Sequence, residues 1–151
     1  MSKKPFVSKE KLDEIAAQYA TPFYLYDETA IRETARRVNK AFAWNQGFKE
    51  YFAVKATPNP AILKILHEEG CGADCSSYTE LQMADAVGFK GDEIMFSSNA
   101  TPAEDFQLAR QLNVTINLDD ITHIDFLEKV ADIPDTVSCR YNPGGHFAIA
   151  N

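Results

Sequence analysis

Short apolar segments recur along the chain at nearly equal intervals. They begin at Tyr51 (YFAVKA), Cys71 (CGADCSS), Glu93 (EIMFSSN), Thr115 (TINLD) and Val137 (VSCRYN), so successive starts lie 20, 22, 22 and 22 residues apart. Short apolar runs that are bounded by turn-forming residues are typical of buried strands. The regular interval therefore predicts five strands that belong to a repeated structural unit.

The stretches between these segments carry patterns typical of amphipathic helices. In NPAILKILHEEG, Asn59 is placed to cap a helix, and in SYTELQMADAVG, Ser77 and Glu80 have the spacing of a capping box. Thr101 and Glu104 repeat this spacing in TPAEDFQLARQL, and DITHIDFLEKV carries apolar residues along one side. Strands that alternate with helices of about ten residues across tight loops predict parallel βα units.

The first part of the chain does not follow this repeat. SKEKLDEIAAQYA predicts a helix, TPFYLYD (21–27) predicts a strand, and a second helix is expected from Asp27 to about Ala43. The strand is far more aromatic than the five repeated ones, which indicates that it belongs to a different sheet. We therefore expect two parts, residues 1–43 and residues 44–151.

Five βα units are compatible with an open doubly wound sheet or with the beginning of a (β/α)8 barrel. In VSCRYN the alternating positions Ser138, Arg140 and Asn142 are polar, and in YFAVKA Lys55 shares a face with Tyr51. Polar groups on one face near strand ends favour a barrel, whose interior opens into a site at the carboxyl ends of the strands. The TPNP that follows the first strand also lacks the glycines of a dinucleotide-binding sheet. We expect an α/β fold that is a partial (β/α)8 barrel.

Composition excludes several classes of function. The chain has 151 residues, is 45% hydrophobic and 25% charged, and carries a formal net charge of -7, so nothing favours binding to nucleic acid. Charged residues interrupt the N-terminal segment, and no apolar run approaches the length of a membrane span, so we expect a cytoplasmic protein with no membrane partner. The three histidines and three cysteines are scattered, which predicts no metal site; the cysteines fall in strand-like segments, where buried thiols are common.

Lys55 is the residue that most needs a chemical explanation. It ends an otherwise apolar strand, although an ammonium group is costly to remove from water unless it is paired or loses its proton. The simplest alternative is a surface lysine with a buried stem and a hydrated head.

The segments TPFYLYD, YFAVKA, GCGADCSSYTEL, MFSSNAT and CRYNPGG occur in an order that resembles the fold-type III pyridoxal-phosphate decarboxylases, above all the diaminopimelate decarboxylases. The resemblance runs from about Thr21 to Gly145. It implies that Lys55 forms the internal aldimine with pyridoxal 5'-phosphate, for which a desolvated site would supply a neutral amine. A substrate amino acid would then displace Lys55 and lose its carboxylate, while the cofactor ring accepts the negative charge.

The resemblance implies roles for three further residues. Asp74 matches a family carboxylate near the lysine and cofactor, although an aspartate here is also suited to capping the next turn. Glu80 matches a family glutamate, but the capping box explains it equally well. Arg140 matches an arginine near the cofactor; a buried guanidinium demands an acidic partner, and Asp74 is the expected one, unless the arginine simply lies on a strand edge. NPGG (142–145) is interpreted as a turn or lid.

The resemblance also implies elements that these residues lack: three barrel strands, a ring-stacking histidine, a glycine-rich phosphate loop, an acid facing the pyridine nitrogen, and a β-domain that would pair with TPFYLYD. We therefore expect the N-terminal portion of a homodimeric diaminopimelate decarboxylase, which converts meso-diaminopimelate to L-lysine and is inactive as an isolated fragment. Other possibilities are a carboxynorspermidine or ornithine decarboxylase, an alanine racemase, or a catalytically silent barrel that binds a partner protein.

Overall fold

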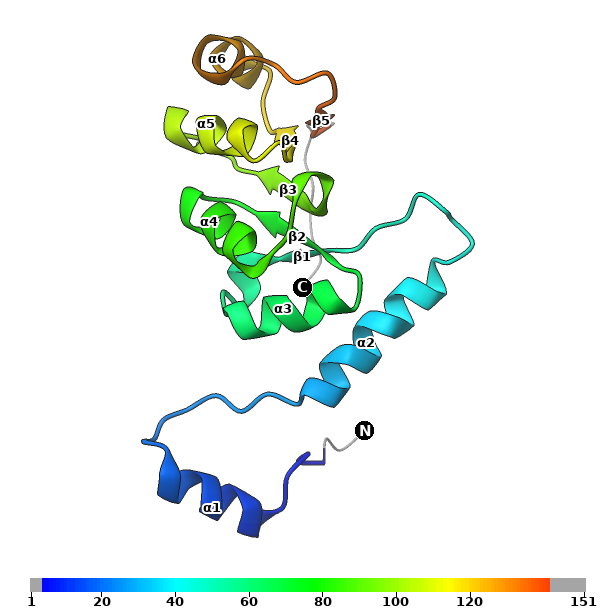
Figure 1. Cartoon of the computed structure of the whole chain (residues 1–151), viewed down its shortest axis with the longest axis vertical. Helices are drawn as coiled ribbons and strands as arrows, with labels where there is room; N and C mark the ends of the chain where they lie inside the picture. Colours follow the sequence, from blue (N-terminus) through cyan, green and yellow to red (C-terminus); the bar gives the residue numbers. More distant parts are fainter. Residues whose placement is uncertain (1–3, 142–151) are drawn as a thin grey trace, which may run out of the picture.

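The computed structural model describes residues 4–141 (Figure 1). The sheet is built from β1 (Tyr51–Ala53), β2 (Gly72–Cys75), β3 (Ile94–Ser97), β4 (Thr115–Leu118) and β5 (Ser138–Cys139). The α-helices are α1 (Lys9–Gln18), α2 (Glu28–Ala41), α3 (Pro60–Glu68), α4 (Tyr78–Val87), α5 (Ala103–Gln111) and α6 (Thr122–Ala131). Two short 3-10 helices are η1 (Val54–Ala56) and η2 (Gly91–Glu93).

All five strands are parallel and pair in sequence order, β1-β2-β3-β4-β5. A helix lies between each strand and the next, and α4, α5 and α6 lie next to one another along one side of the strands (Figure 1). The repeated βα unit expected from the sequence is therefore confirmed, because a parallel connection needs a crossover segment long enough to hold a helix.

The core lies between the sheet and this layer of helices. In β3, Ile94 and Phe96 are buried, whereas Met95 and Ser97, which alternate with them, are only half-buried. One face of the strand therefore packs on helices while the other face has little cover. Full burial of a large apolar side chain contributes about 1.5–3 kcal/mol, so these residues supply much of the stability. The largest fully buried side chains include Phe89, Phe96, Phe106, Leu63, Leu81, Ile94, Ile116 and Leu127.

Side-chain caps begin several helices where the sequence places them. Asn59 Oδ1 accepts a hydrogen bond from the backbone nitrogen of Ala61 at 2.9 Å, and Ser77 caps α4. The cap expected at Thr101 is wrong. Pro102 occupies the N-cap position of α5 instead, so Thr101 lies one residue too early, and its Oγ1 is buried without a partner in the described part of the chain.

Residues 21–27, expected to form a strand and to pair with a separate β-domain, form no strand within the described residues. This segment belongs to no sheet, and Tyr24 is 89% exposed. The rings of Tyr24 and Tyr26 lie 6.4 Å apart and stacked, as alternate residues of an extended segment can. A strand is defined by its backbone partner, and no other segment of residues 4–141 pairs with this one. The preceding helix α1 buries no residue.

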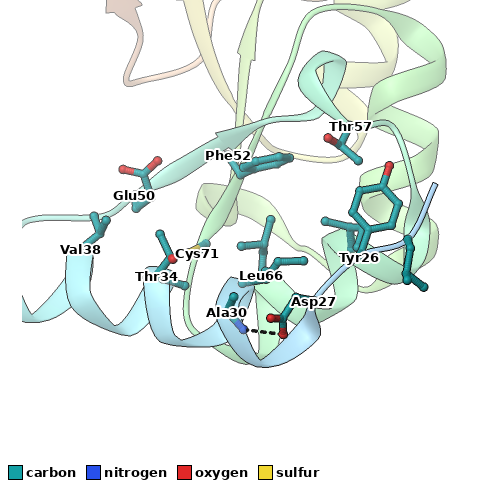
Figure 2. A pocket seen from close by; sticks show the side chains of 14 residues that line it. Tyr26, Asp27, Ala30, Thr34, Val38, Glu50, Phe52, Thr57, Leu66 and Cys71 are labelled. Carbon is teal, nitrogen blue, oxygen red and sulfur yellow. Dashed lines mark hydrogen bonds between the residues drawn. The ribbon is translucent and has the colours of Figure 1, made fainter. Parts of the chain in front are cut away.

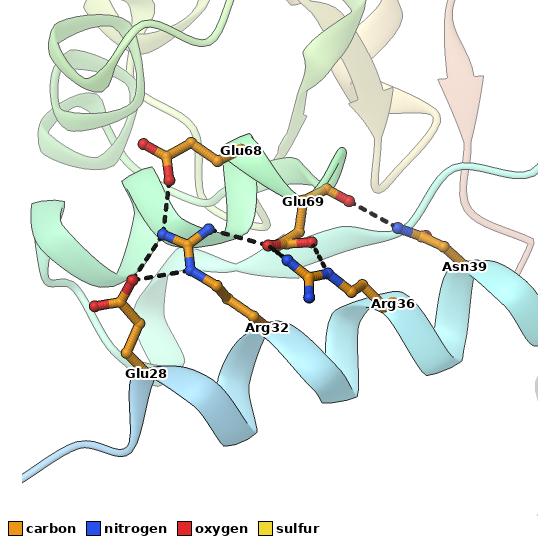
Figure 3. A network of polar contacts seen from close by, with 6 residues as sticks. All are labelled: Glu28, Arg32, Arg36, Asn39, Glu68 and Glu69. Atoms are coloured by element: carbon orange, nitrogen blue, oxygen red, sulfur yellow. Dashed lines mark hydrogen bonds and ion pairs between the residues drawn. The ribbon is translucent and has the colours of Figure 1, made fainter.

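The second helix, α2, is held against α3 by a polar network in addition to apolar contacts (Figure 3). Arg36 donates to both carboxylate oxygens of Glu69, at 2.6 and 2.7 Å, and Arg32 donates to the same group at 3.0 Å. The two guanidinium groups hold the pKa of Glu69 below its ordinary value. The complete network consists of Glu28, Arg32, Arg36, Asn39, Glu68 and Glu69.

Candidate functional site

The sheet face opposite the helices carries polar side chains along four strands. They are half-buried and alternate with the core residues, and the Cα partners Ser97 and Asn117, and Asn117 and Ser138, lie side by side. Ser138 Oγ donates to Asn117 Oδ1 at 2.8 Å. The prediction of a polar face near the strand ends is confirmed; this polar face consists of Asp74, Ser97, Thr115, Asn117 and Ser138.

The sequence pattern predicted that Lys55 ends a strand, and this prediction is wrong. The ladder of β1 stops at Ala53, and Lys55 follows in the 3-10 turn η1 between fully buried Val54 and exposed Ala56. The side chain of Lys55 is exposed, and no described residue forms a hydrogen bond or ion pair with it. The expectation of a desolvated amine is therefore wrong for the described residues. The physical reason is that none of them forms a second layer over the polar face.

Asp74 occupies the strand next to this lysine. Its Cα is the ladder partner of Ala53, two residues before Lys55. Its carboxylate oxygen Oδ1 accepts a hydrogen bond from Ser97 Oγ of β3 at 2.5 Å, and the residue is half-buried. The capping role considered for Asp74 is not observed, since Ser77 caps the helix that follows. The arrangement places a fixed carboxylate beside the turn that carries the amine.

Arg140 is paired with Asp119 and not with Asp74, so the expected partner is wrong. Arg140 Nη1 lies 2.7 Å from Asp119 Oδ1, and the arginine side chain is 49% exposed. Asn99 Nδ2 donates to Asp119 Oδ2 at 3.1 Å. Two strands separate β2 from β5, which at about 4.8 Å per strand gives roughly 14 Å. Sequence reasoning missed Asp119, although it directly follows β4 at the edge where the other polar residues meet.

Glu80 has a structural role at the start of α4. Its carboxylate accepts hydrogen bonds from the backbone nitrogen of Ser76 at 2.8 Å and from Ser76 Oγ at 3.1 Å. In return, Ser77 Oγ accepts a hydrogen bond from the Glu80 nitrogen at 3.4 Å. This is the capping box expected from the sequence, shifted by one residue on the glutamate side. A role for Glu80 at a cofactor stays a prediction. Asn142 and the NPGG segment, interpreted as a turn or lid, lie outside the described residues.

The cysteines provide no reactive group on the polar face. Cys75 is fully buried in the core, and burial together with Glu80 and Asp74 raises the pKa of its thiol to about 12. Burial also raises the pKa of Cys71. Cys139 differs from the sequence expectation because it is exposed. A buried thiol with a raised pKa is a poor nucleophile.

A cavity of about 510 Å³ lies between α2, β1 and α3 (Figure 2). Its walls are mainly apolar and include Val38, Phe52 and Leu66. Phe52 points to the face of β1 opposite Ala53, so this cavity and the polar face with Asp74 lie on different sides of the strand. Asp27, at its edge, is engaged in capping α2 through the nitrogen of Ala30. The cavity offers no amine, and the acid on its wall, Glu50, lies on the side of β1 away from Asp74, so the cavity lacks the paired amine and acid that cofactor chemistry requires.

Two further findings limit the kinds of site present. No helix within residues 4–141 combines the length and the apolar character that crossing a bilayer requires. In the same part of the chain, histidine, cysteine and acidic side chains do not gather in groups of three that could hold a metal ion.

Parallel βα units with helices on one face, and polar groups at the strand ends on the other, define an α/β-barrel protein with its site at the carboxyl ends of the strands. The sequence narrows this class. Residues 28–148 match the family "Pyridoxal-dependent decarboxylase, pyridoxal binding domain", and the chain belongs to this family. The five-stranded sheet is accordingly a partial (β/α)8 barrel.

Individual relatives agree with this assignment. The chain is 47% identical over 137 residues to protein TabA of Pseudomonas amygdali pv. tabaci, covering 91% of this chain and 32% of that protein. It is 37% identical over 131 residues to a diaminopimelate decarboxylase of Methanothermobacter thermautotrophicus, and the match covers 86% of this chain and 31% of that protein. A crystal structure of diaminopimelate decarboxylase from Helicobacter pylori, complexed with L-lysine, superposes with a TM-score of 0.68 at 32% identity. The superposition covers 79% of this chain and 30% of that one. The chain thus spans about a third of the length of the curated relatives it matches.

Pyridoxal phosphate is the cofactor of this family, and the described residues fit its aldehyde end. Lys55 offers an exposed amine that no described residue engages, and Asp74 supplies an acid on the adjacent strand. For the phosphate group, a glycine-rich turn at the carboxyl end of a strand is the usual cradle. The glycines among residues 4–141 lie instead at or before the amino ends of β1, β2 and β3, so this part of the chain provides no such turn.

Proposed function

We propose that this chain is the cofactor-holding N-terminal part of an amino-acid decarboxylase that acts on meso-diaminopimelate and yields L-lysine and carbon dioxide. The observation that carries the proposal is Lys55, an exposed amine without a described partner, placed directly after β1 and beside the β2 carboxylate. The named diaminopimelate decarboxylases among the relatives support the choice of substrate, as does the L-lysine of the Helicobacter pylori complex.

Each of the four site residues expected from the sequence has a part in this proposal. Pyridoxal phosphate, when bound, supplies an electron sink for the negative charge that loss of carbon dioxide leaves on the substrate. The Lys55 nitrogen would hold the aldehyde carbon of the cofactor, and the Asp74 carboxylate would stabilise positive charge next to it. Arg140, held by Asp119, would present cationic charge at the far side of the face. Glu80 would act indirectly, by fixing the loop between β2 and α4.

The broader organisation is part of the same proposal. Residues 44–151 would form the first part of the barrel, and residues 1–43 the N-terminal segment that packs outside it. The complete protein would be a cytoplasmic homodimer, as the sequence resemblance implies. The 151-residue chain alone is expected to show no turnover of diaminopimelate, because the described residues supply the aldehyde end of the site but no phosphate cradle.

Covalent capture of the cofactor tests the role of Lys55. The chain is mixed with pyridoxal phosphate, borohydride reduces any carbon–nitrogen double bond between cofactor and lysine to a stable single bond, and the labelled lysine is identified by peptide mass spectrometry. We expect Lys55 to take most of the label and Lys55→Ala to lose it. Lys64→Ala is the matched control, since Lys64 is also exposed but lies on α3 in the helical layer. Equal labelling of Lys55 and Lys64 would contradict the proposal.

Competition with amino acids tests the substrate. An amino acid whose amino group takes the place of the Lys55 nitrogen before reduction would lower the label on that residue. We expect meso-diaminopimelate to lower it more than ornithine or alanine at the same concentration. Stronger competition by ornithine would instead support an ornithine decarboxylase, and stronger competition by alanine a racemase.

A further inference from the structure

Ser97 is the only described residue whose side chain contacts the Asp74 carboxylate through a hydrogen bond. Its Oγ donates to Asp74 Oδ1 at 2.5 Å, and both residues are half-buried on the polar face. The second oxygen, Oδ2, accepts no hydrogen bond from residues 4–141. One oxygen is thus held by β3, and the other has no hydrogen-bond partner among the described residues.

The strand register explains why this serine reaches the carboxylate. Asp74 is the ladder partner of Ala53 on one side and of Met95 on the other. Lys55 and Ser97 each lie two residues farther along their segments, toward the carboxyl ends of the strands. Asp74 therefore lies between the amine-bearing turn on one side and the hydroxyl on the other. The hydrogen bond from β3 to β2 therefore fixes which way the Asp74 carboxylate turns relative to β1.

The neighbouring serine on the same face offers a comparison. Ser138 also donates to a side chain of the adjacent strand, Asn117 Oδ1, at 2.8 Å. That pair lies on β4 and β5, away from Asp74 on β2. Both serines are half-buried and make one side-chain hydrogen bond, but only Ser97 contacts a group beside Lys55.

We propose that Ser97 is a positioning residue for the cofactor site: its hydroxyl holds Asp74 Oδ1 so that Oδ2 faces the group bound by Lys55. The inference rests on the proposed function and deepens it. A hydrogen bond between a hydroxyl and a carboxylate is stronger than one between neutral groups, so its loss leaves the carboxylate free to rotate toward solvent. The positive charge on the Lys55 nitrogen, when it holds the cofactor, would then lose part of its stabilisation.

The test follows the visible absorbance of the chain loaded with pyridoxal phosphate as pH is raised. The Lys55 nitrogen, when bound to the cofactor, would give up a proton at a midpoint pH that a nearby carboxylate raises. We expect Ser97→Ala to lower this midpoint by about half a pH unit, roughly a threefold change in the proton equilibrium. Ser97→Thr keeps a hydroxyl and is expected to restore most of the shift. Circular dichroism checks that each variant is folded.

Two comparisons separate positioning from a purely structural role. In a chain that already carries Asp74→Asn, the added Ser97→Ala is expected to cause no further shift, because it acts through the carboxylate. Ser138→Ala, which loses a similar hydrogen bond elsewhere on the face, is expected to leave the midpoint unchanged. Equal shifts in Ser97→Ala and Ser138→Ala, or a full Ser97→Ala shift in the chain without the carboxylate, would overturn the inference alone. Absence of any Lys55-dependent absorbance in the unaltered chain would overturn the proposed function as well.

Discussion

Replacing Gly72 with alanine tests the close approach of β1 and β2 on which the candidate site depends. A Cβ at this position would lie 2.6 Å from Tyr51 Cδ1 and 2.7 Å from the backbone oxygen of Glu93, closer than real Cβ atoms come to other atoms. The Tyr51 ring cannot easily turn away, because its hydroxyl donates to the Asp92 backbone oxygen at 2.5 Å. The backbone of β2 must therefore move away from its neighbours.

The expected loss of stability follows from these contacts. Forcing an extra methyl group into a packed region costs about 1–3 kcal/mol. If Tyr51 is displaced, the net loss of its hydrogen bond to Asp92 adds about 1 kcal/mol. We expect Gly72→Ala to lower the free energy of unfolding by about 2–4 kcal/mol, a large part of the roughly 5–15 kcal/mol of a typical domain.

Urea unfolding followed by far-ultraviolet circular dichroism measures this loss. Gly47→Ala is the matched control, because a Cβ there meets only Asn45 Oδ1 at 3.7 Å, and its effect should stay within about 0.5 kcal/mol. Tyr51→Phe removes the hydroxyl alone and should cost about 1 kcal/mol. If Gly72→Ala unfolds at the same urea concentration as Gly47→Ala, the Tyr51 ring does not pack against Gly72 as closely as the structure shows.

Two more predictions concern titrating groups. Iodoacetamide at mildly alkaline pH should alkylate exposed Cys139 and leave Cys75 intact, because burial raises the pKa of the Cys75 thiol to about 12; peptide mass spectrometry with and without urea checks this, and fast native labelling of Cys75 would refute it. Glu69→Gln should lower the urea midpoint at neutral pH, since the folded pKa of Glu69 is held below its ordinary 4.5 by Arg36 and Arg32. That stabilisation is present above the ordinary pKa and lost as pH falls through the lowered one, so the two proteins should converge in acid; a difference that persists there would contradict the assignment.

Local signals in the sequence predicted much of the fold. Asn59 and Ser77 cap helices where expected, because a cap depends only on the next two or three residues. The equal spacing of the apolar segments predicted the parallel strands for a similar reason, since each βα unit repeats the same local pattern. The cap expected at Thr101 is wrong by a single position, because Pro102 is the N-cap residue of α5.

The errors in the prediction concern contacts between distant residues. The segment at 21–27 has the composition of a strand, but pairing needs a partner that local pattern does not reveal. The acidic partner of Arg140 depended on strand order, which placed Asp119 next to it and Asp74 three strands away. Burial of Lys55 could not be judged from its apolar neighbours, because exposure is set by what covers the strand end.

In the 3-10 turn η1, the residue that packs in the core and the residue proposed to react with the cofactor are neighbours but not the same residue. Val54 anchors the turn in the core, while the Lys55 side chain is exposed and forms no hydrogen bond or ion pair with a described residue. Under the proposed function, exchange of that one side chain would therefore change reactivity at little cost in folding. A scaffold with this property tolerates changes of catalytic group far more readily than one whose nucleophile is also a packing residue.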